Sequence, residues 1–245
     1  MAAQSPRRVA LVVGAGDATG GAIARRFAQG GYTVCATRRQ LEKLQPLLEG
    51  IRAAGGEAHG FACDARNEEQ VDALFDDIEA RLGAIEVFVF NVGANARASI
   101  LEENARQYFE LWETNCFAGF LTARKAARCM APRGQGTMLF TGATASLRGG
   151  AGFAAFAGAK AALRALAQSM ARELGPRGIH VAHVVIDGGI VSPRMRDHQP
   201  ERYALKDQDG ILDPAHIAEN YWMLHLQPRD AWTHELDLRP WSEKF

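Results

Sequence analysis

The sequence has no excess of charge of either sign. Its 245 residues include 28 lysines and arginines against 28 aspartates and glutamates, a formal net charge of zero. A chain balanced in this way has no general electrostatic attraction for nucleic acid or for an anionic membrane surface. We therefore expect neither nucleic acid nor a membrane among its partners.

Long apolar runs and patterned cysteines are also missing. No stretch reaches the ~20 apolar residues of a membrane span, and the first residues, MAAQSPRRVALVVGAG, contain only a short apolar run that ends in glycines. That pattern favours a first strand over a signal peptide. The four cysteines, Cys35, Cys63, Cys116 and Cys129, show neither CxxC nor metal-ligand spacing. Reduced thiols in a cytoplasmic protein without a bound metal are therefore expected.

Apolar runs alternate with segments of helical periodicity along the whole chain. Strands are expected near residues 9–13, 33–37, 58–62, 87–90, 137–141, 180–186 and 235–238. Helices are expected near residues 23–28, 41–54, 71–82, 105–130, 153–174 and 215–226. The alternation predicts an α/β fold, a Rossmann-like doubly wound parallel sheet of about seven strands with helices on both faces.

No repeat, linker or low-complexity segment divides the sequence, so residues 1–245 are expected to form a single domain. Roughly twenty-five polar, proline-containing residues follow the strand expected at 180–186. A loop of that length in a compact domain is more often a lid or a binding element than a connector. We expect a substrate-binding loop at about residues 188–212.

The segment VALVVGAGDATGGAIARRFA has the order strand, glycine-rich turn, helix. Gly14 and Gly16 permit a tight turn and close backbone approach, and Gly20 lets the helix pack on the strand and direct its first amides at a pyrophosphate. A turn that only packs strand against helix would also use glycines. In this strand–helix context the pattern favours a dinucleotide site.

Together with segments farther along, this turn makes the chain resemble the short-chain dehydrogenase/reductase superfamily over nearly its full length. Gly14 and Gly20 match the family's glycine pattern, with Ala18 at the position of its middle glycine and Gly16 in addition. The sequence NVGA, from Asn91, is similar to the family's Asn-Asn-Ala-Gly motif after the fourth strand.

Matches elsewhere follow in the family's order. Asp64 stands where the family's aspartate contacts adenine, Asn115 occupies the mid-helix asparagine, and Asp187-Gly188 replaces a Pro-Gly pair. Taken singly, Asp64 and Asn91 would also suit loop capping. Taken together, the matches imply a nicotinamide cofactor held by Gly14, Gly16, Gly20, Arg38, Arg39, Asp64, Asn91, Lys160, Asp187 and Gly188.

The end of the second strand bears on the choice of cofactor. Relatives that prefer NAD carry an acid there, whereas this chain has Thr37 followed by Arg38 and Arg39. An unpaired guanidinium suits a 2′-phosphate, so NADP(H) is favoured over NAD(H). Asp17 in the glycine-rich turn argues the other way, because NADP-specific relatives often have a base at that position.

The family's catalytic positions depart from their usual composition. Hydride addition to a carbonyl builds charge on oxygen, which the family neutralises with a tyrosine and a serine. The four positions here are Asn115, Ala143, Phe156 and Lys160. The lysine keeps the family's role of binding the nicotinamide ribose, and the residues that would touch a substrate oxygen are gone. Thr144 and Asp187 are candidate substitutes.

Three functions are considered on this resemblance, of which a plain structural scaffold without cofactor is disfavoured by Gly14, Gly20, Asp64, Asn91 and Lys160 together. Two remain open. The first is an NAD(P)(H)-dependent oxidoreductase with a non-standard active site, acting on a small-molecule carbonyl, alcohol or imine. The second is a catalytically silent NADP(H)-binding homologue that serves as a sensor or a partner subunit. In either case the family resemblance, with an aromatic stripe on the helix expected at 105–130, implies a homodimer or homotetramer.

Overall fold

The computed structural model describes residues 7–244, which contain one parallel sheet of seven strands. The strands are β1 (Val9–Val13), β2 (Thr33–Arg38), β3 (Ala58–Ala62), β4 (Ile85–Phe90), β5 (Gly136–Thr141), β6 (Ile179–Ile186) and β7 (Glu235–Leu238). Their order is β3-β2-β1-β4-β5-β6-β7, and every neighbouring pair is parallel. The predicted Rossmann-like sheet is confirmed.

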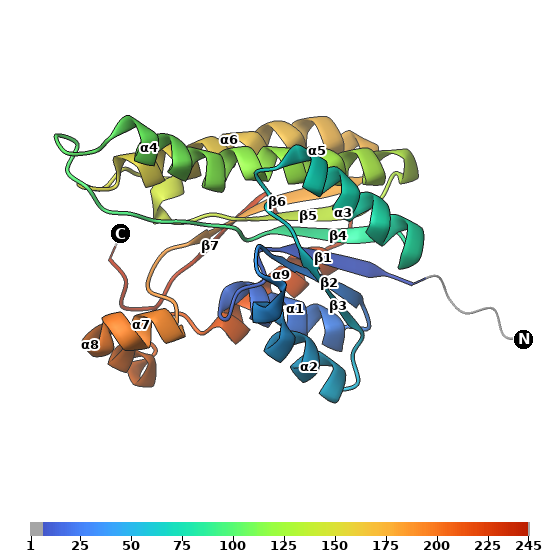
Figure 1. Cartoon of the computed structure of the whole chain (residues 1–245), viewed down its shortest axis with the longest axis horizontal. Helices are drawn as coiled ribbons and strands as arrows, with labels where there is room; N and C mark the ends of the chain where they lie inside the picture. Colours follow the sequence, from blue (N-terminus) through green and yellow to red (C-terminus); the bar gives the residue numbers. More distant parts are fainter. Residues whose placement is uncertain (1–6, 245) are drawn as a thin grey trace, which may run out of the picture.

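Helices cover both faces of the sheet (Figure 1). One face carries α3 (Glu68–Arg81), α4 (Ala105–Trp112), α5 (Ala118–Met130) and α6 (Ala154–Leu174), and the other carries α1 (Thr19–Gln29), α2 (Gln45–Ala53) and α9 (Pro214–Leu226). Alternate residues of β1 enter opposite layers of the core, with Val9, Leu11 and Val13 in one and Ala10 and Val12 in the other. This alternation explains why a strand buried on both faces is apolar throughout.

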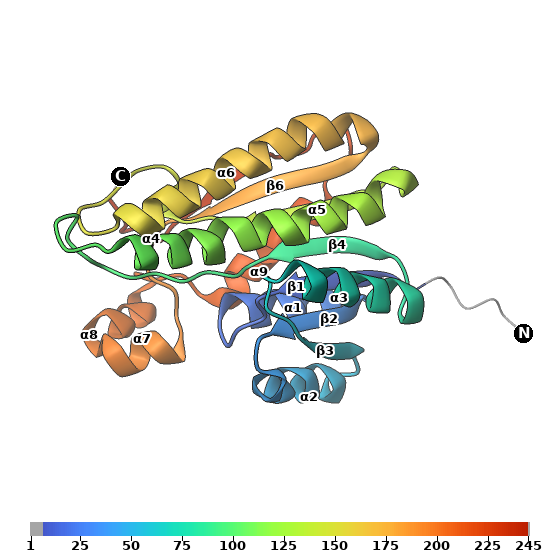
Figure 2. The same cartoon turned by 45° about the horizontal axis from the view of Figure 1, so that its top comes forward.

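The helix expected at residues 105–130 is interrupted. A π-helical turn, Glu113–Phe117, separates α4 from α5, and Asn115 lies within it. The Asn115 side chain donates hydrogen bonds to the carbonyl oxygens of Leu111 and Ala94, at 2.9 and 2.8 Å. A side chain that binds a helix carbonyl oxygen disturbs the regular ladder of backbone hydrogen bonds. Apolar periodicity does not register such a bond, so the sequence pattern did not reveal the interruption. Figure 2 shows α6 beside the combined α4–α5 helix.

The loop expected at residues 188–212 is largely helical, so that expectation is wrong for most of the segment. It contains α7 (Pro193–His198), α8 (Pro200–Tyr203) and a 3₁₀ turn at Ala204–Gln208. Each of the two helices begins with proline, whose fixed φ suits a first helical position. Ser192 caps α7 by accepting a hydrogen bond from the Met195 amide at 3.2 Å. The prolines, read as loop signals, are helix starts here.

Candidate functional site

The strand order reverses between β1 and β4, which lie side by side and lead into helices that continue in opposite directions across the sheet. In open α/β sheets ligands bind at such a switch point, outside the carboxyl ends of the strands. Asn91 follows β4 there, and its Nδ2 donates to the Gly14 carbonyl oxygen at 3.0 Å. This bond ties the end of β4 to the glycine-rich turn after β1.

The backbone of the glycine-rich turn leaves no room for side chains at two positions. Gly14 has φ +86°, and a Cβ there would lie 2.8 Å from the Val92 amide nitrogen. A Cβ on Gly20 would lie 2.4 Å from the Gly14 carbonyl oxygen. Gly16 has no heavy atom within 4 Å of such a Cβ, and no side chain caps the first turn of α1. The exposed turn and the free helix amides fit a diphosphate group.

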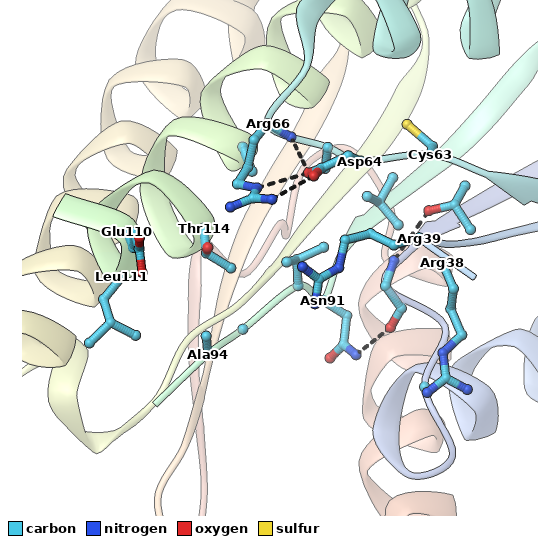
Figure 3. A pocket seen from close by; sticks show the side chains of 18 of the residues that line it. Arg38, Arg39, Cys63, Asp64, Arg66, Asn91, Ala94, Glu110, Leu111 and Thr114 are labelled. Atoms are coloured by element: carbon cyan, nitrogen blue, oxygen red, sulfur yellow. Dashed lines mark hydrogen bonds and ion pairs between the residues drawn. The ribbon is translucent and has the colours of Figure 1, made fainter. Parts of the chain in front are cut away.

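A cavity of about 540 Å³ extends from this turn along the ends of β1, β2 and β4 (Figure 3). Gly16, Thr37, Arg39, Asp64 and Asn91 contribute to its lining. The structure therefore brings together most of the residues expected to hold a dinucleotide.

The two arginines after β2 have different environments. Arg38 donates to Asp17 Oδ1 at 2.9 Å and to the Lys43 carbonyl oxygen at 3.0 Å. Arg39 lines the cavity and makes no hydrogen bond or ion pair within residues 7–244. In Figure 3 the Arg38 side chain turns away from Arg39, which extends toward Asn91. Both arginines thus line the cavity, and Asp17 neutralises only the Arg38 guanidinium.

Asp64 is held by Arg66, a partner that the sequence interpretation missed. The Asp64 carboxylate accepts hydrogen bonds from Arg66 Nε at 2.9 Å and from Arg66 Nη2 at 2.6 Å. These hydrogen bonds hold the pKa of Asp64 below its usual value. Both residues line the cavity, so any contact with a bound adenosine would come from a fixed Asp64–Arg66 pair. The only sequence signal was their close spacing.

A second cavity of about 740 Å³ adjoins the first and shares residues 91–94 with it. Phe156 and Lys160 line it from α6, one helical turn apart, and Ala143 lines it after β5. Asn115 lies behind Gly93, because a Cβ on that glycine would be 3.5 Å from Asn115 Oδ1 and 3.7 Å from Lys160 Nζ. The four positions that resemble a catalytic tetrad are therefore gathered at one place.

Lys160 is buried, with 4% of its surface exposed. Its Nζ donates to the Thr141 carbonyl oxygen at 2.9 Å and has no ion-pair partner in the described part of the chain. Burial without a counter-charge lowers the pKa of Lys160 to about 8. The Thr141 hydroxyl is bonded to Asn91 Oδ1 and to the Tyr221 hydroxyl, at 2.9 and 2.7 Å. This network fixes the position of the amine.

The two candidate substitutes for the missing donors bond to each other. The Thr144 hydroxyl donates to Asp187 Oδ1, and Arg239 lies 3.4 Å from Asp187 Oδ2. Thr144 lines the second cavity, whereas Asp187 is 2% exposed and does not. Gly188 beside it does line that cavity. None of the four tyrosines of the chain contributes to the lining.

Three arginines of the second cavity escaped the sequence interpretation: Arg148, Arg194 and Arg202. Within residues 7–244 no cluster of histidine, cysteine and carboxylate side chains is placed to hold a metal, and the four cysteines are unpaired. No helix in that range has both the length and the apolar character that crossing a bilayer requires.

Known proteins resemble this chain in sequence and in fold. The sequence pattern of the short chain dehydrogenase family matches residues 8–204. A short-chain dehydrogenase from Rhodopseudomonas palustris is 48% identical, with a TM-score of 0.83 over 96% of this chain and 99% of that one. A metagenomic short-chain oxidoreductase in complex with NADP is 27% identical, with a TM-score of 0.81 over 95% and 97% of the two chains.

A curated relative agrees with these matches. The short-chain reductase protein NovJ of Streptomyces niveus is 30% identical over 213 residues, which cover 87% of this chain and 80% of NovJ. The matched residues include both the glycine-rich turn and the segment with Phe156 and Lys160. With this fold, this switch-point cavity and these relatives, the chain belongs to the short-chain dehydrogenase/reductase family of oxidoreductases.

Proposed function

We propose that the protein is an NADP(H)-dependent oxidoreductase with a non-standard active site. The observation that carries this proposal is the pair of adjoining cavities, one suited to a dinucleotide and the other containing Lys160 beside Phe156 and Ala143. Its substrate would be a small molecule that gains or loses a hydride at a carbonyl, alcohol or imine carbon.

The residues present fit the cofactor. The uncapped start of α1 and the open backbone at Gly16 would bind the diphosphate, Arg39 the 2′-phosphate, and Lys160 the nicotinamide ribose. Bound NADPH would supply a hydride to a substrate in the second cavity. The protein's own part is to align that substrate, exclude water and manage protons.

Proton supply is where this site departs from its family. A general acid contributes roughly 10²–10⁴-fold to the rate, and an oxygen-binding donor ~3 kcal/mol more. Phe156 and Ala143 offer neither, and Thr144 is bonded to Asp187. Hydride transfer to a cationic iminium discharges positive charge and needs no proton at that step. The site therefore suits imine reduction better than ketone reduction.

Isotope transfer tests this function. After fluorescence titration establishes NADPH binding, the protein is incubated with 4-deuterated NADPH and matched sets of ketones and cyclic imines. We expect deuterium to enter the amine products at rates roughly 10²-fold above those for reduction of the ketones. A factor of this size is the rate contribution that one general acid typically makes. Similar low rates for both sets would remove the preference for imines.

The second candidate is a silent NADP(H)-binding homologue. The same observation favours it, because the residues that would touch a substrate oxygen are Phe156 and Ala143. Cofactor binding without deuterium transfer to any substrate of either set would select this alternative.

Arg39 and Arg38 provide a test of cofactor choice. We expect Arg39→Ala to weaken NADPH binding roughly 10–100-fold and to leave NADH binding nearly unchanged, since a charge-assisted hydrogen bond contributes about 1.5–3 kcal/mol. Arg38→Ala is the matched control, because Asp17 already occupies that guanidinium. A larger loss of NADPH affinity in Arg38→Ala than in Arg39→Ala would contradict the assignment. Fluorescence titration with both nucleotides measures it.

We also propose a homodimer or homotetramer. Phe109, Trp112, Phe117 and Phe120 form a row of stacked rings along α4 and α5, with successive centroids 5.9, 5.9 and 6.1 Å apart. Phe109 is 57% exposed and Phe120 is 37% exposed. Trp112 and Phe117 between them are partly buried. A contiguous aromatic row that is exposed at both ends supports a subunit contact.

A further inference from the structure

We propose that the substrate carries an anionic group, a carboxylate or a phosphate, which Arg148, Arg194 and Arg202 bind at the second cavity. The proposal rests on the proposed function, because it takes that cavity as the substrate site. It adds a substrate class that neither the family nor the fold specifies.

The three arginines reach one cavity from three different segments. Arg148 lies in the turn between β5 and α6, Arg194 in α7 and Arg202 in α8. None of their guanidinium groups makes a hydrogen bond or an ion pair with any residue from 7 to 244. Their convergence depends on the packing of α7 and α8 near the carboxyl ends of the strands, visible in Figure 1.

The cavity offers these arginines no counter-charge. Among its lining residues in the described structure there is no aspartate or glutamate, while Lys160 adds a fourth basic group. Nearby acids are engaged elsewhere or lie outside the lining. Asp187 bonds Thr144, and Glu201 next to Arg202 does not line the cavity. Glu243 Oε2 would lie 3.6 Å from a Cβ on Gly188, but Glu243 does not line the cavity either.

Two acids of residues 193–208 pair with other bases of the same segment. Asp197 accepts from Arg196 at 2.8 Å, and Asp207 from Lys206 at 2.5 Å. Elsewhere in the chain arginines commonly have acidic partners, as Arg164 does in Glu235 at 2.6 Å. Free guanidinium groups gathered at a cavity favour an anion, since their fork matches carboxylate and phosphate oxygens bidentately.

The other residues that line the cavity indicate the chemical character of the remainder of the ligand. Phe153, Phe156, Ile190 and Met195 supply apolar surface, and Ser192 and Gln199 supply neutral polar groups. An apolar body with one anionic end fits this distribution better than a polyol. The observations thus favour an organic acid or a phosphate ester of modest size.

A cofactor diphosphate is the other source of the same chemistry. Ser192, two residues before Arg194, lines a smaller depression together with Asp17 of the glycine-rich turn, so this segment lies near the expected diphosphate site. The position of Arg148 favours a substrate anion over the cofactor diphosphate. Arg148 lines the second cavity beside Gly149, Gly150 and Phe153, and it does not line the nucleotide cavity.

Calorimetric titration of the NADP-saturated protein tests the proposal with two probes of one shape, 3-phenylpropionate and 3-phenylpropionamide. We expect the carboxylate to bind roughly tenfold or more tightly than the amide. Single Arg148→Ala, Arg194→Ala and Arg202→Ala variants should each weaken carboxylate binding roughly tenfold and leave amide binding within about twofold. Arg128→Ala removes an exposed arginine of α5 outside the cavity and should change neither.

Equal affinities for the two probes, or no carboxylate binding at millimolar concentration, would overturn the proposal and leave the oxidoreductase function intact. Loss of NADPH affinity in the arginine variants, with the carboxylate preference unchanged, would assign the arginines to the cofactor and also overturn it. Failure of NADPH to bind the wild-type protein would instead refute the proposed function, and the two probes would then be compared without cofactor.

Discussion

Ketone reduction with NADPH is expected to rise by roughly 10²–10⁴-fold when Phe156→Tyr and Ala143→Ser are combined. Both positions line the cavity that contains Lys160. Phe156 lies one helical turn before Lys160, so a phenol there would stand near an ammonium group that favours its ionised form. The serine would add a donor for the substrate oxygen. Steady-state kinetics on the ketone set measures the gain.

Phe153→Tyr is the matched control, because Phe153 lines the same cavity and precedes the first residue of α6. A new phenol at that position should give little gain. Combining Phe156→Tyr and Ala143→Ser with Lys160→Met should remove most of the gain. A double variant that binds NADPH with wild-type affinity but reduces ketones no faster would show that the missing donors are not what limits this site.

A fall in pH is expected to destabilise the protein already at pH values above those at which most carboxylates become protonated. His183 is fully buried on β6, with Nδ1 3.1 Å from Glu235 Oε2, and burial lowers the pKa of His183 to about 4. The unfolded chain binds a proton below the ordinary pKa of 6.5, whereas the folded chain does not until about pH 4. Stability therefore falls as the pH drops through this window, by roughly 2 kcal/mol between pH 7 and pH 5.

His225 adds to this loss, because burial also lowers its pKa to about 4, with Arg8 nearby. Urea denaturation at several pH values measures the slope. His183→Gln should flatten it, whatever its effect on stability at pH 7, and His216→Gln, on the exposed side of α9, controls for the loss of one histidine. A slope unchanged by His183→Gln would mean that the buried ring does not resist protonation.

The strand segments were predictable from local pattern. The expected strands at 9–13, 58–62 and 235–238 match β1, β3 and β7, and the other four differ by one or two residues at an end. An inner strand covered on both faces, such as β1, is mostly apolar, so its signal is present in the residues themselves. The break at Asn115 and the helices at Pro193 and Pro200 were missed, because each depends on hydrogen bonds or prolines that periodicity does not register.

The sequence by itself determined the family, the sheet, the glycine-rich turn, and the presence of Phe156 and Ala143 at positions where relatives have donors. These depend on spacing between near neighbours. Only the tertiary structure decided that Asp17 neutralises Arg38 but not Arg39, and that Arg148 and Arg194 face one cavity. Such pairings join residues far apart in the chain. They follow from how strands and helices pack, which local pattern does not contain.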